Sequence, residues 1–240
     1  IAVVPFAQGP GVLAPETPLH EVIAADLRRS GLFEPMAVAD MIDRPTRPAE
    51  VRANTWNLLR VDYVAMGRIV PAADGQGEEI EYHLVATPSG RTLFSRAIAA
   101  GPGEYRLRAH QIADAIYEEL IGVPGAFASR IAYVKVTDTG TDDEQFELIV
   151  ADSYGYNPQT IVRHSQPILS PSWAPDGRRI AYVSFATGRS NVIVQDIFTG
   201  QREVVSSERG INGAPAFSPD GRYLAMSLSR SGSPEIWVRD

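Results

Sequence analysis

The sequence predicts an α+β N-terminal domain, with a mixed sheet and helices on one face, followed by an all-β propeller. Three observations support this fold class. Helical periodicity is confined to the first half of the 240 residues, a seven-residue element recurs 44 positions later in the second half, and each copy places Pro-Asp-Gly between apolar runs. We place the N-terminal domain at residues 1–124 and the propeller at residues 129–240.

The N-terminal domain begins with an apolar, β-branched run at residues 1–6, which predicts a buried strand. A helix follows, with Thr17 as its cap, Pro18 in its first position and Gly31 at its end in the left-handed conformation. A second helix is predicted from Pro48 to Arg60. Its expected inward-facing residues are Val51, Thr55, Leu58 and Leu59.

The rest of this domain reads as three strands and a helix. Residues 61–70 are strand-like, Asp74-Gly75 is expected to turn the chain, and residues 79–87 and 91–99 form a predicted hairpin. Residues 104–121 give the best helical pattern in the chain, because apolar residues recur at helical spacing. They are Tyr105, Ala109, Ile112, Ile116 and Leu120. Residues 122–128 read as a linker.

The second half is a repeat. The segment 171–177 (PSWAPDG) recurs as 215–221 (PAFSPDG), an offset of 44, and an earlier partial copy begins at Arg130. Four short strands in about 44 residues are typical of a propeller blade, and propellers close with about 4–8 blades. We count blades from about residues 130, 170 and 214, so about 2.5 blades, and expect the parent protein to continue past Asp240.

Composition excludes several classes of function. The net charge is -7 without a basic run, so nucleic acid is a poor partner. Cysteine is absent, which removes disulfides, thiolate metal sites and a cysteine nucleophile. No apolar run approaches the roughly 18 residues of a membrane-spanning helix.

The residues with catalytic chemistry have structural explanations. Asp176 and Asp220 lie in Pro-Asp-Gly and are predicted to form turns, while Trp173 and Phe217 are predicted to pack between blades. The four histidines lack the spacing of a zinc site. We therefore predict no catalytic, metal-binding or cofactor-binding residue.

Five stretches, taken together, are more specific than the repeat alone. They are residues 1–6 and 22–31, the junction 125–127 with 130–134, and residues 152–157 and 212–221. This combination resembles the TolB family, the periplasmic propeller proteins of the Tol–Pal system. The resemblance implies a six-bladed propeller and a non-enzymatic adaptor that links Pal at the outer membrane with TolA of the inner-membrane complex. The implied roles are outer-membrane integrity and envelope constriction during cell division.

The resemblance also implies where partners bind. Pal would dock on a propeller face through loops that match residues 165–171 and 209–215, and colicins are a further implied partner. TolA would bind a segment that precedes Ile1 in the family and is missing here. The candidate partner-binding residues are His164, Ser170, Ile211, Asn212, Gly213 and Ala214. The family often has histidine where this chain has Ile211.

Two alternatives remain open from the residues alone. The propeller could belong to a serine peptidase, which would need a hydrolase domain with a Gly-x-Ser-x-Gly elbow that these residues do not contain. It could also be a stand-alone propeller that binds a sugar or a peptide.

Overall fold

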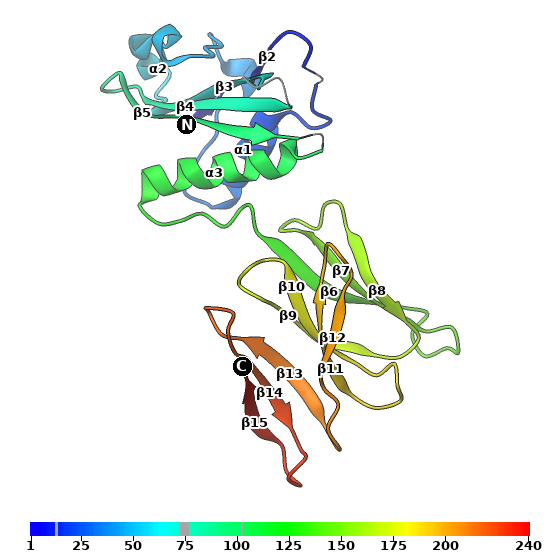
Figure 1. Ribbon diagram of the computed structural model, residues 1–240. Helices are drawn as coiled ribbons and strands as arrows, with labels where there is room; N and C mark the ends of the chain where they lie inside the picture. The colour runs from blue at the N-terminus through cyan, green and yellow to red at the C-terminus, as the bar shows by residue number, and fades with distance from the viewer. Residues whose placement is uncertain (13, 73–76, 102) are drawn as a thin grey trace. The chain divides into compact units, whose positions relative to one another are not determined.

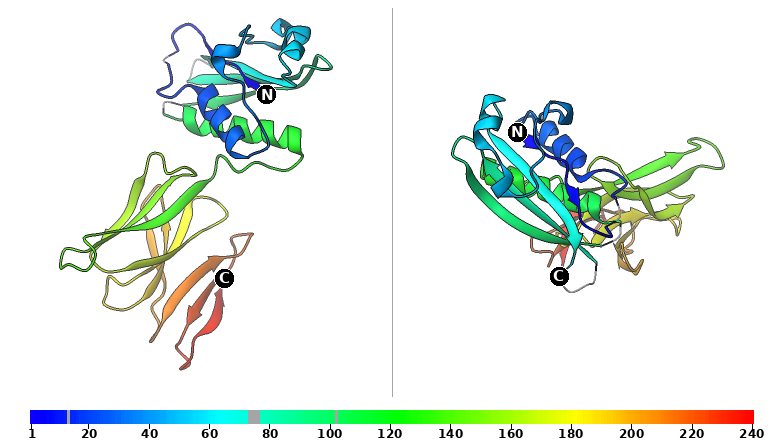
Figure 2. Two further views of the ribbon diagram at one scale, coloured as in Figure 1. Left: turned by 180° about the vertical axis from the view of Figure 1, so that it is seen from behind. Right: turned by 90° about the horizontal axis from the view of Figure 1, so that it is seen from above.

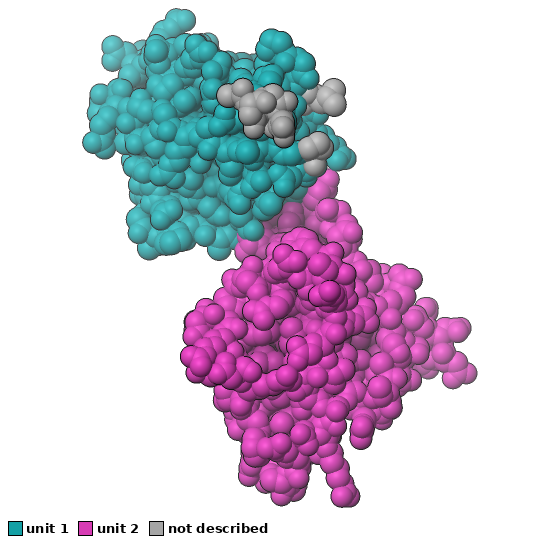
Figure 3. Space-filling view, in the orientation of Figure 1, with its two compact units in different colours: residues 1–128 teal, residues 129–240 magenta. Residues whose placement is uncertain are grey.

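The computed structural model describes residues 1–12, 14–72, 77–101 and 103–240. It divides into two compact units, residues 1–128 (unit 1) and 129–240 (unit 2), which Figure 3 colours separately. The turn predicted at Asp74-Gly75 lies outside the described residues. Among the residues described, no helix combines the length and the apolar character needed to cross a membrane.

Unit 1 is built on a mixed sheet in the order β1-β3-β4-β5, with β2 also paired to β3. The strands are β1 (Ala2–Val3), β2 (Ala7–Gln8), β3 (Tyr63–Pro71), β4 (Glu78–Ala86) and β5 (Arg91–Ala100). Both β1 and β2 run parallel to β3, whereas β3, β4 and β5 are antiparallel neighbours. The mixed sheet and the hairpin predicted from the sequence are confirmed.

The strand expected over residues 1–6 is instead two short strands along one edge of β3. The interruption contains Pro5, which has no N–H to donate to the sheet. The turned chain lays the Phe6 ring over Gly67, where an added Cβ would lie 2.8 Å from Phe6 Cδ1. Gly67 is therefore the residue that lets Phe6 enter the core.

The two long helices, α1 (Leu19–Arg29) and α3 (Tyr105–Ile121), pack together on one face of this sheet. Figures 1 and 2 show them on the same side. The helical spacing and the left-handed Gly31, at φ 74°, are confirmed. The expected Thr17 cap is wrong, because Pro18 occupies the cap position and no side chain bonds the helix start.

The opposite face is covered by α2 (Ala53–Leu58) and two 3₁₀ turns, Val38–Asp40 and Pro48–Glu50. The helix predicted from Pro48 to Arg60 is thus broken at Val51 and Arg52, both in extended or irregular conformation. Because of this break, α2 begins as a separate helix and a different set of its residues faces the sheet. Trp56 is fully buried against the sheet, and Leu58, expected in the core, is 86% exposed.

Asp26 on α1 and His110 on α3 form a buried polar pair. The Asp26 Oδ2 and His110 Nδ1 atoms lie 2.6 Å apart, and both side chains are almost completely inaccessible to water. A polar pair inside an apolar core holds the two helices in one register, since either group alone would be desolvated without compensation. His110 therefore lies within the helix core.

Unit 2 consists of three antiparallel sheets in chain order. The first contains β6 (Arg130–Thr137), β7 (Gln145–Asp152) and β8 (Gln159–His164). The second contains β9 (Ile168–Trp173), β10 (Arg179–Ser184), β11 (Asn191–Asp196) and β12 (Arg202–Ser206), and the third contains β13 (Asn212–Phe217), β14 (Leu224–Leu228) and β15 (Glu235–Arg239). These sheets are consecutive parts of a propeller, as predicted.

Apolar side chains fill the space between successive sheets. Trp173 packs in a cluster shared by the first and second sheets, and Phe217 in a cluster shared by the second and third, which confirms their inter-blade role. Asp176 Oδ1 accepts the backbone N–H groups of Arg178 and Arg179, and Asp220 Oδ1 accepts that of Arg222. Both aspartates are therefore turn residues, as the sequence predicts.

Candidate functional site

The six candidate residues lie on or beside three edge strands of unit 2. His164 ends β8, Ser170 lies within β9, Ile211 immediately precedes β13, and Asn212, Gly213 and Ala214 open β13. The strands β9 and β13 each begin their sheet, have one paired neighbour in it, and contact each other. The repeat therefore brings Ser170 and Ala214 to equivalent positions on adjacent strands.

Ser170 and Ala214 share an unusual backbone conformation. Their φ angles are 51° and 46°, in the left-handed region that residues other than glycine rarely adopt. Each precedes a proline, and the pairing of each strand shifts register at this point. These are β-bulges on edge strands, and the proline removes the N–H that an added strand would need. The bulges and prolines therefore disfavour pairing of an additional strand at this edge.

Apolar side chains are exposed beside the bulges. Ile211 is 54% exposed and Leu169 is 47% exposed. Leu169 lies within residues 165–171, a loop that the resemblance implied, but is not among the six candidate residues. It is the counterpart of Gly213 at the repeat offset of 44. Aligning the two copies residue by residue across β9 and β13 would have identified it. The candidate surface thus comprises Leu169, Ser170, Ile211, Gly213 and Ala214, with His164 at the preceding turn.

Asn212 differs from its neighbours because its side chain is only 1% exposed. Its Oδ1 accepts the Ser206 hydroxyl at 2.6 Å and the Glu208 N–H at 2.9 Å, and its Nδ2 donates to the carbonyls of Glu208 and Gly210. Its backbone N–H donates to Ser190 Oγ of the previous sheet's hairpin at 2.9 Å. Asn212 therefore shapes the loop that carries Ile211 and does not itself face a partner.

The loop is also held from its other side. The Ile211 N–H donates to Ser229 Oγ at 2.7 Å, and the Ser229 N–H donates to the Ile211 carbonyl at 3.1 Å. Gly210 has φ 89°, and a Cβ there would overlap the Ser229 hydroxyl. These hydrogen bonds therefore order the loop and hold Ile211 in its exposed position.

His164 is fixed at the turn between β8 and β9. The Gln166 N–H donates to His164 Nδ1 at 2.8 Å. Since a backbone N–H can only donate, Nδ1 is the acceptor and the proton of the neutral ring sits on Nε2. The ring therefore offers one N–H donor at the edge of the candidate surface.

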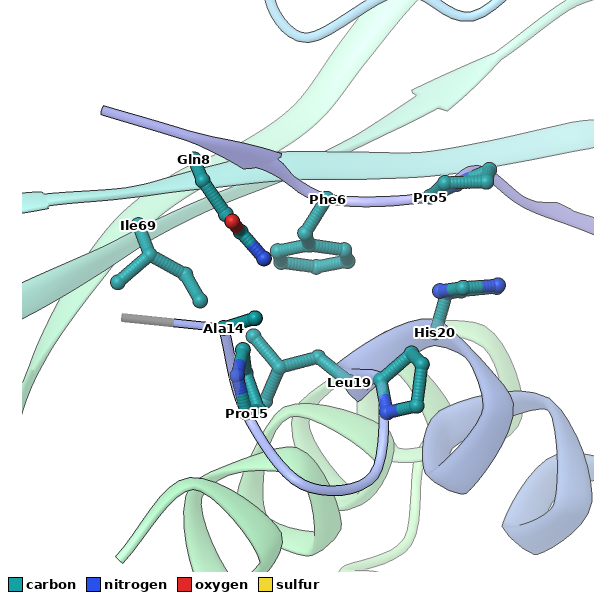
Figure 4. A pocket seen from close by; sticks show the side chains of 9 residues that line it. Pro5, Phe6, Gln8, Ala14, Pro15, Leu19, His20 and Ile69 are labelled. Atoms are coloured by element: carbon teal, nitrogen blue, oxygen red, sulfur yellow. The ribbon is translucent and has the colours of Figure 1, made fainter. Parts of the chain in front are cut away.

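Unit 1 contains a hollow of about 240 Å³ between β2, the start of α1 and the loop that joins them (Figure 4). Among the described residues that line it there is no carboxylate, ammonium or guanidinium group. The lining residues are Pro5, Phe6, Gln8, Ala14, Pro15, Pro18, Leu19, His20 and Ile69. Burial lowers the pKa of His20. An apolar hollow with one amide and one imidazole does not form a catalytic set.

Metal chemistry finds no support elsewhere in the described part of the chain, where no three His, Asp or Glu side chains converge on one point. The acidic residues 142–144 lie in the loop between β6 and β7, where the Glu144 Oε1 accepts the Gly140 N–H at 3.3 Å.

Comparison with known proteins finds one family in both halves of the chain. The family described as TolB amino-terminal domain matches residues 1–93, and that described as TolB beta propeller domain matches residues 117–240. The Tol-Pal system protein TolB of Xanthomonas euvesicatoria pv. vesicatoria is 51% identical over 215 residues, covering 89% of this chain and 48% of that protein. The protein of the same name from Xanthomonas campestris pv. campestris gives the same values.

A solved structure agrees with this assignment. The crystal structure of TolB from Acinetobacter baumannii matches with a TM-score of 0.82 and 36% identity, covering 100% of this chain and 57% of that one. The chain spans about half the length of the curated relatives it matches. Matched in both of its halves and similar to named relatives throughout, the chain belongs to the TolB family of Tol–Pal system proteins.

Proposed function

We propose that this chain belongs to a non-enzymatic periplasmic adaptor that links the Pal lipoprotein at the outer membrane with TolA of the inner-membrane complex. Its role is to maintain outer-membrane integrity and envelope constriction during cell division. The observation that carries the proposal is the match of both units to the TolB family, whose relatives are named as Tol-Pal system proteins.

The candidate surface of unit 2 supports a protein partner. Two exposed aliphatic side chains, Leu169 and Ile211, flank two strained bulges on adjacent strands. Strained backbone persists where the surrounding structure holds it, and such positions cluster at binding sites. We assign Pal to this surface, with Leu169 and Ile211 as apolar anchors and His164 Nε2 as a hydrogen-bond donor. Colicins would compete for the same face.

The proposed binding sites for Pal and for TolA lie in different parts of the sequence. TolA binding is assigned to a segment that precedes Ile1 in the family and is not among these residues. Asn212 contributes indirectly, because its buried side chain holds the loop that presents Ile211.

Binding of the full-length protein to the periplasmic domain of Pal tests the proposal by calorimetry. We expect a complex, and Ile211→Asp should weaken it at least about tenfold, because a charge replaces an aliphatic side chain that becomes buried. Val204→Asp is the matched control, since Val204 on β12 is 57% exposed and lies outside the surface.

Absence of any complex would contradict the adaptor role. A complex that tolerates Ile211→Asp as well as Val204→Asp would keep the adaptor role and reject this surface.

A further inference from the structure

The segment that joins the two units is held against unit 1. The helix α3 ends at Ile121, Gly122 takes a left-handed φ of 83°, and β6 begins at Arg130. Residues 122–129 thus form an eight-residue connection. The sequence suggested an ordinary linker, but the structure gives its last residues specific partners on α3.

Asp114 on α3 is the principal partner. Its Oδ1 accepts the Phe127 N–H at 2.7 Å and its Oδ2 accepts the Ala128 N–H at 3.0 Å. Both carboxylate oxygens are therefore used by consecutive backbone amides. Burial raises the pKa of Asp114, and the hydrogen bonds from Phe127 and Ala128 act in the opposite direction. The two donors thus compensate a partly desolvated carboxylate.

Gly125 allows the segment to approach the helix this closely. A Cβ at Gly125 would lie 2.8 Å from Asp114 Cα and closer still to its carboxylate. Because the helix backbone cannot move aside, any larger residue at position 125 would push the segment away. The close approach is therefore specific to glycine.

Aromatic rings also hold this segment, through Tyr117, which lies three residues after Asp114 on α3. The Phe127 ring meets the Tyr117 ring edge-on, with centroids 5.6 Å apart, and Tyr117 meets Phe33 in the same manner at 6.1 Å. All three rings pack against the core of α1 and α3. Such pairs add about 0.5–1.5 kcal/mol to apolar burial.

We propose that Asp114 and the amides of Phe127 and Ala128 form a latch that sets the length of the tether between the two units. With the latch closed, only Ser129 separates the anchored Ala128 from β6. Opening the latch removes the two backbone anchors nearest to β6, so that more of residues 122–129 can contribute to the tether. Each further residue that is released adds about 3.5 Å to the reach of the tether. The latch affects how unit 1 and unit 2 are connected, and this role does not depend on which partners the units bind.

Hydrogen exchange of the full-length protein tests the contact. In Asp114→Ala and in Gly125→Ala, the amides of Phe127 and Ala128 should exchange about tenfold faster or more, as for loss of one charge-assisted hydrogen bond. Peptides from β3 and β4 should keep their protection, which shows that unit 1 remains folded. Glu119→Gln, an exposed carboxylate on the same helix, is the control and should match the wild type.

Should Asp114→Ala fail to fold, Asp114→Asn replaces it, since its single oxygen can serve one amide and should give an intermediate rate. Unchanged protection of Phe127 and Ala128 in both Asp114 and Gly125 variants would overturn the latch. Wild-type amides that exchange at the unprotected rate would do the same.

Distance distributions between the units test the consequence. The chain has no cysteine, so Ser89→Cys and Ser231→Cys place one spin label on an exposed turn of each unit. Because the spread of a flexible tether grows as the square root of its length, latch variants should broaden the distribution about twofold or more. An unchanged width in Asp114→Ala and Gly125→Ala would overturn the claim that the latch sets the tether.

Discussion

The two units bury their apolar side chains in different ways. In unit 1, a single sheet carries one cluster on each face, and the larger one joins residues from both ends of the unit through α1 and α3. In unit 2, the clusters lie between successive sheets, and β10 supplies both of them, with Tyr182 in one and Ala181 in the other. We therefore expect unfolding to be cooperative across all of unit 1, whereas in unit 2 we expect cooperativity to run from sheet to neighbouring sheet.

This difference in packing predicts how far the destabilising effect of a substitution should spread. Removing a core residue of unit 1 should weaken helices and strands together, because they share a cluster. Removing an inter-sheet contact in unit 2 should weaken one junction and leave the other in place. Three substitutions, ordered by expected effect, test this contrast.

Trp56→Ala should give the largest effect. Trp56 is fully buried between α2 and the sheet, so truncation leaves a cavity that costs about 3–5 kcal/mol. Chemical denaturation followed by circular dichroism would measure the loss in unit 1. Leu58→Ala is the matched control on the same helix, since Leu58 is 86% exposed and should change stability by less than about 0.5 kcal/mol. Equal effects of the two variants would contradict the packing of α2.

The same helix shows why the sequence predicted the long elements better than the short ones. The pattern of α3 extends over several turns, so one irregular position does not change its phase. The segment 48–60 has only a 3₁₀ turn and a short helix, and the break at Val51 and Arg52 has no glycine or internal proline to mark it. The inward-facing residue consequently moves from Leu58 to Trp56.

Arg130→Ala should give an intermediate effect at one junction of unit 2. The Arg130 guanidinium lies over the Trp173 ring, 5.1 Å from its centroid, and donates to the Gly177 carbonyl of the next sheet. Burial lowers its pKa, so this cation is partly desolvated. We expect a loss of about 1–2 kcal/mol, measured from Trp173 fluorescence during denaturation.

Arg222→Ala provides the control for that junction. Arg222 contacts Tyr223 and Asp240 within the third sheet, so its removal should leave Trp173 fluorescence unchanged. A matching response from the two variants would show that unit 2 unfolds as one body and that its junctions are not independent.

The candidate surface was predictable only in part. Repeat spacing located β9 and β13, because Pro-Asp-Gly turns are formed by local contacts. The burial of Asn212 was not predictable, since it depends on Ser206 and on Ser190 from the previous sheet. The left-handed conformations of Ser170 and Ala214 were equally unpredictable, because neither residue type favours that conformation.

Asp220→Asn should give the smallest effect, confined to unit 2. The Ser218 hydroxyl and the Arg222 N–H donate to Asp220 and hold its pKa below the ordinary value of 3.8. A carboxylate with a lowered folded-state pKa contributes stability above its ordinary pKa, and that contribution is lost as the pH falls through the lowered value. The difference in melting temperature between wild type and Asp220→Asn should therefore shrink from about pH 6 to about pH 2.5. A difference that grew on acidification would mean that protonated Asp220 stabilises the turn more than the carboxylate does.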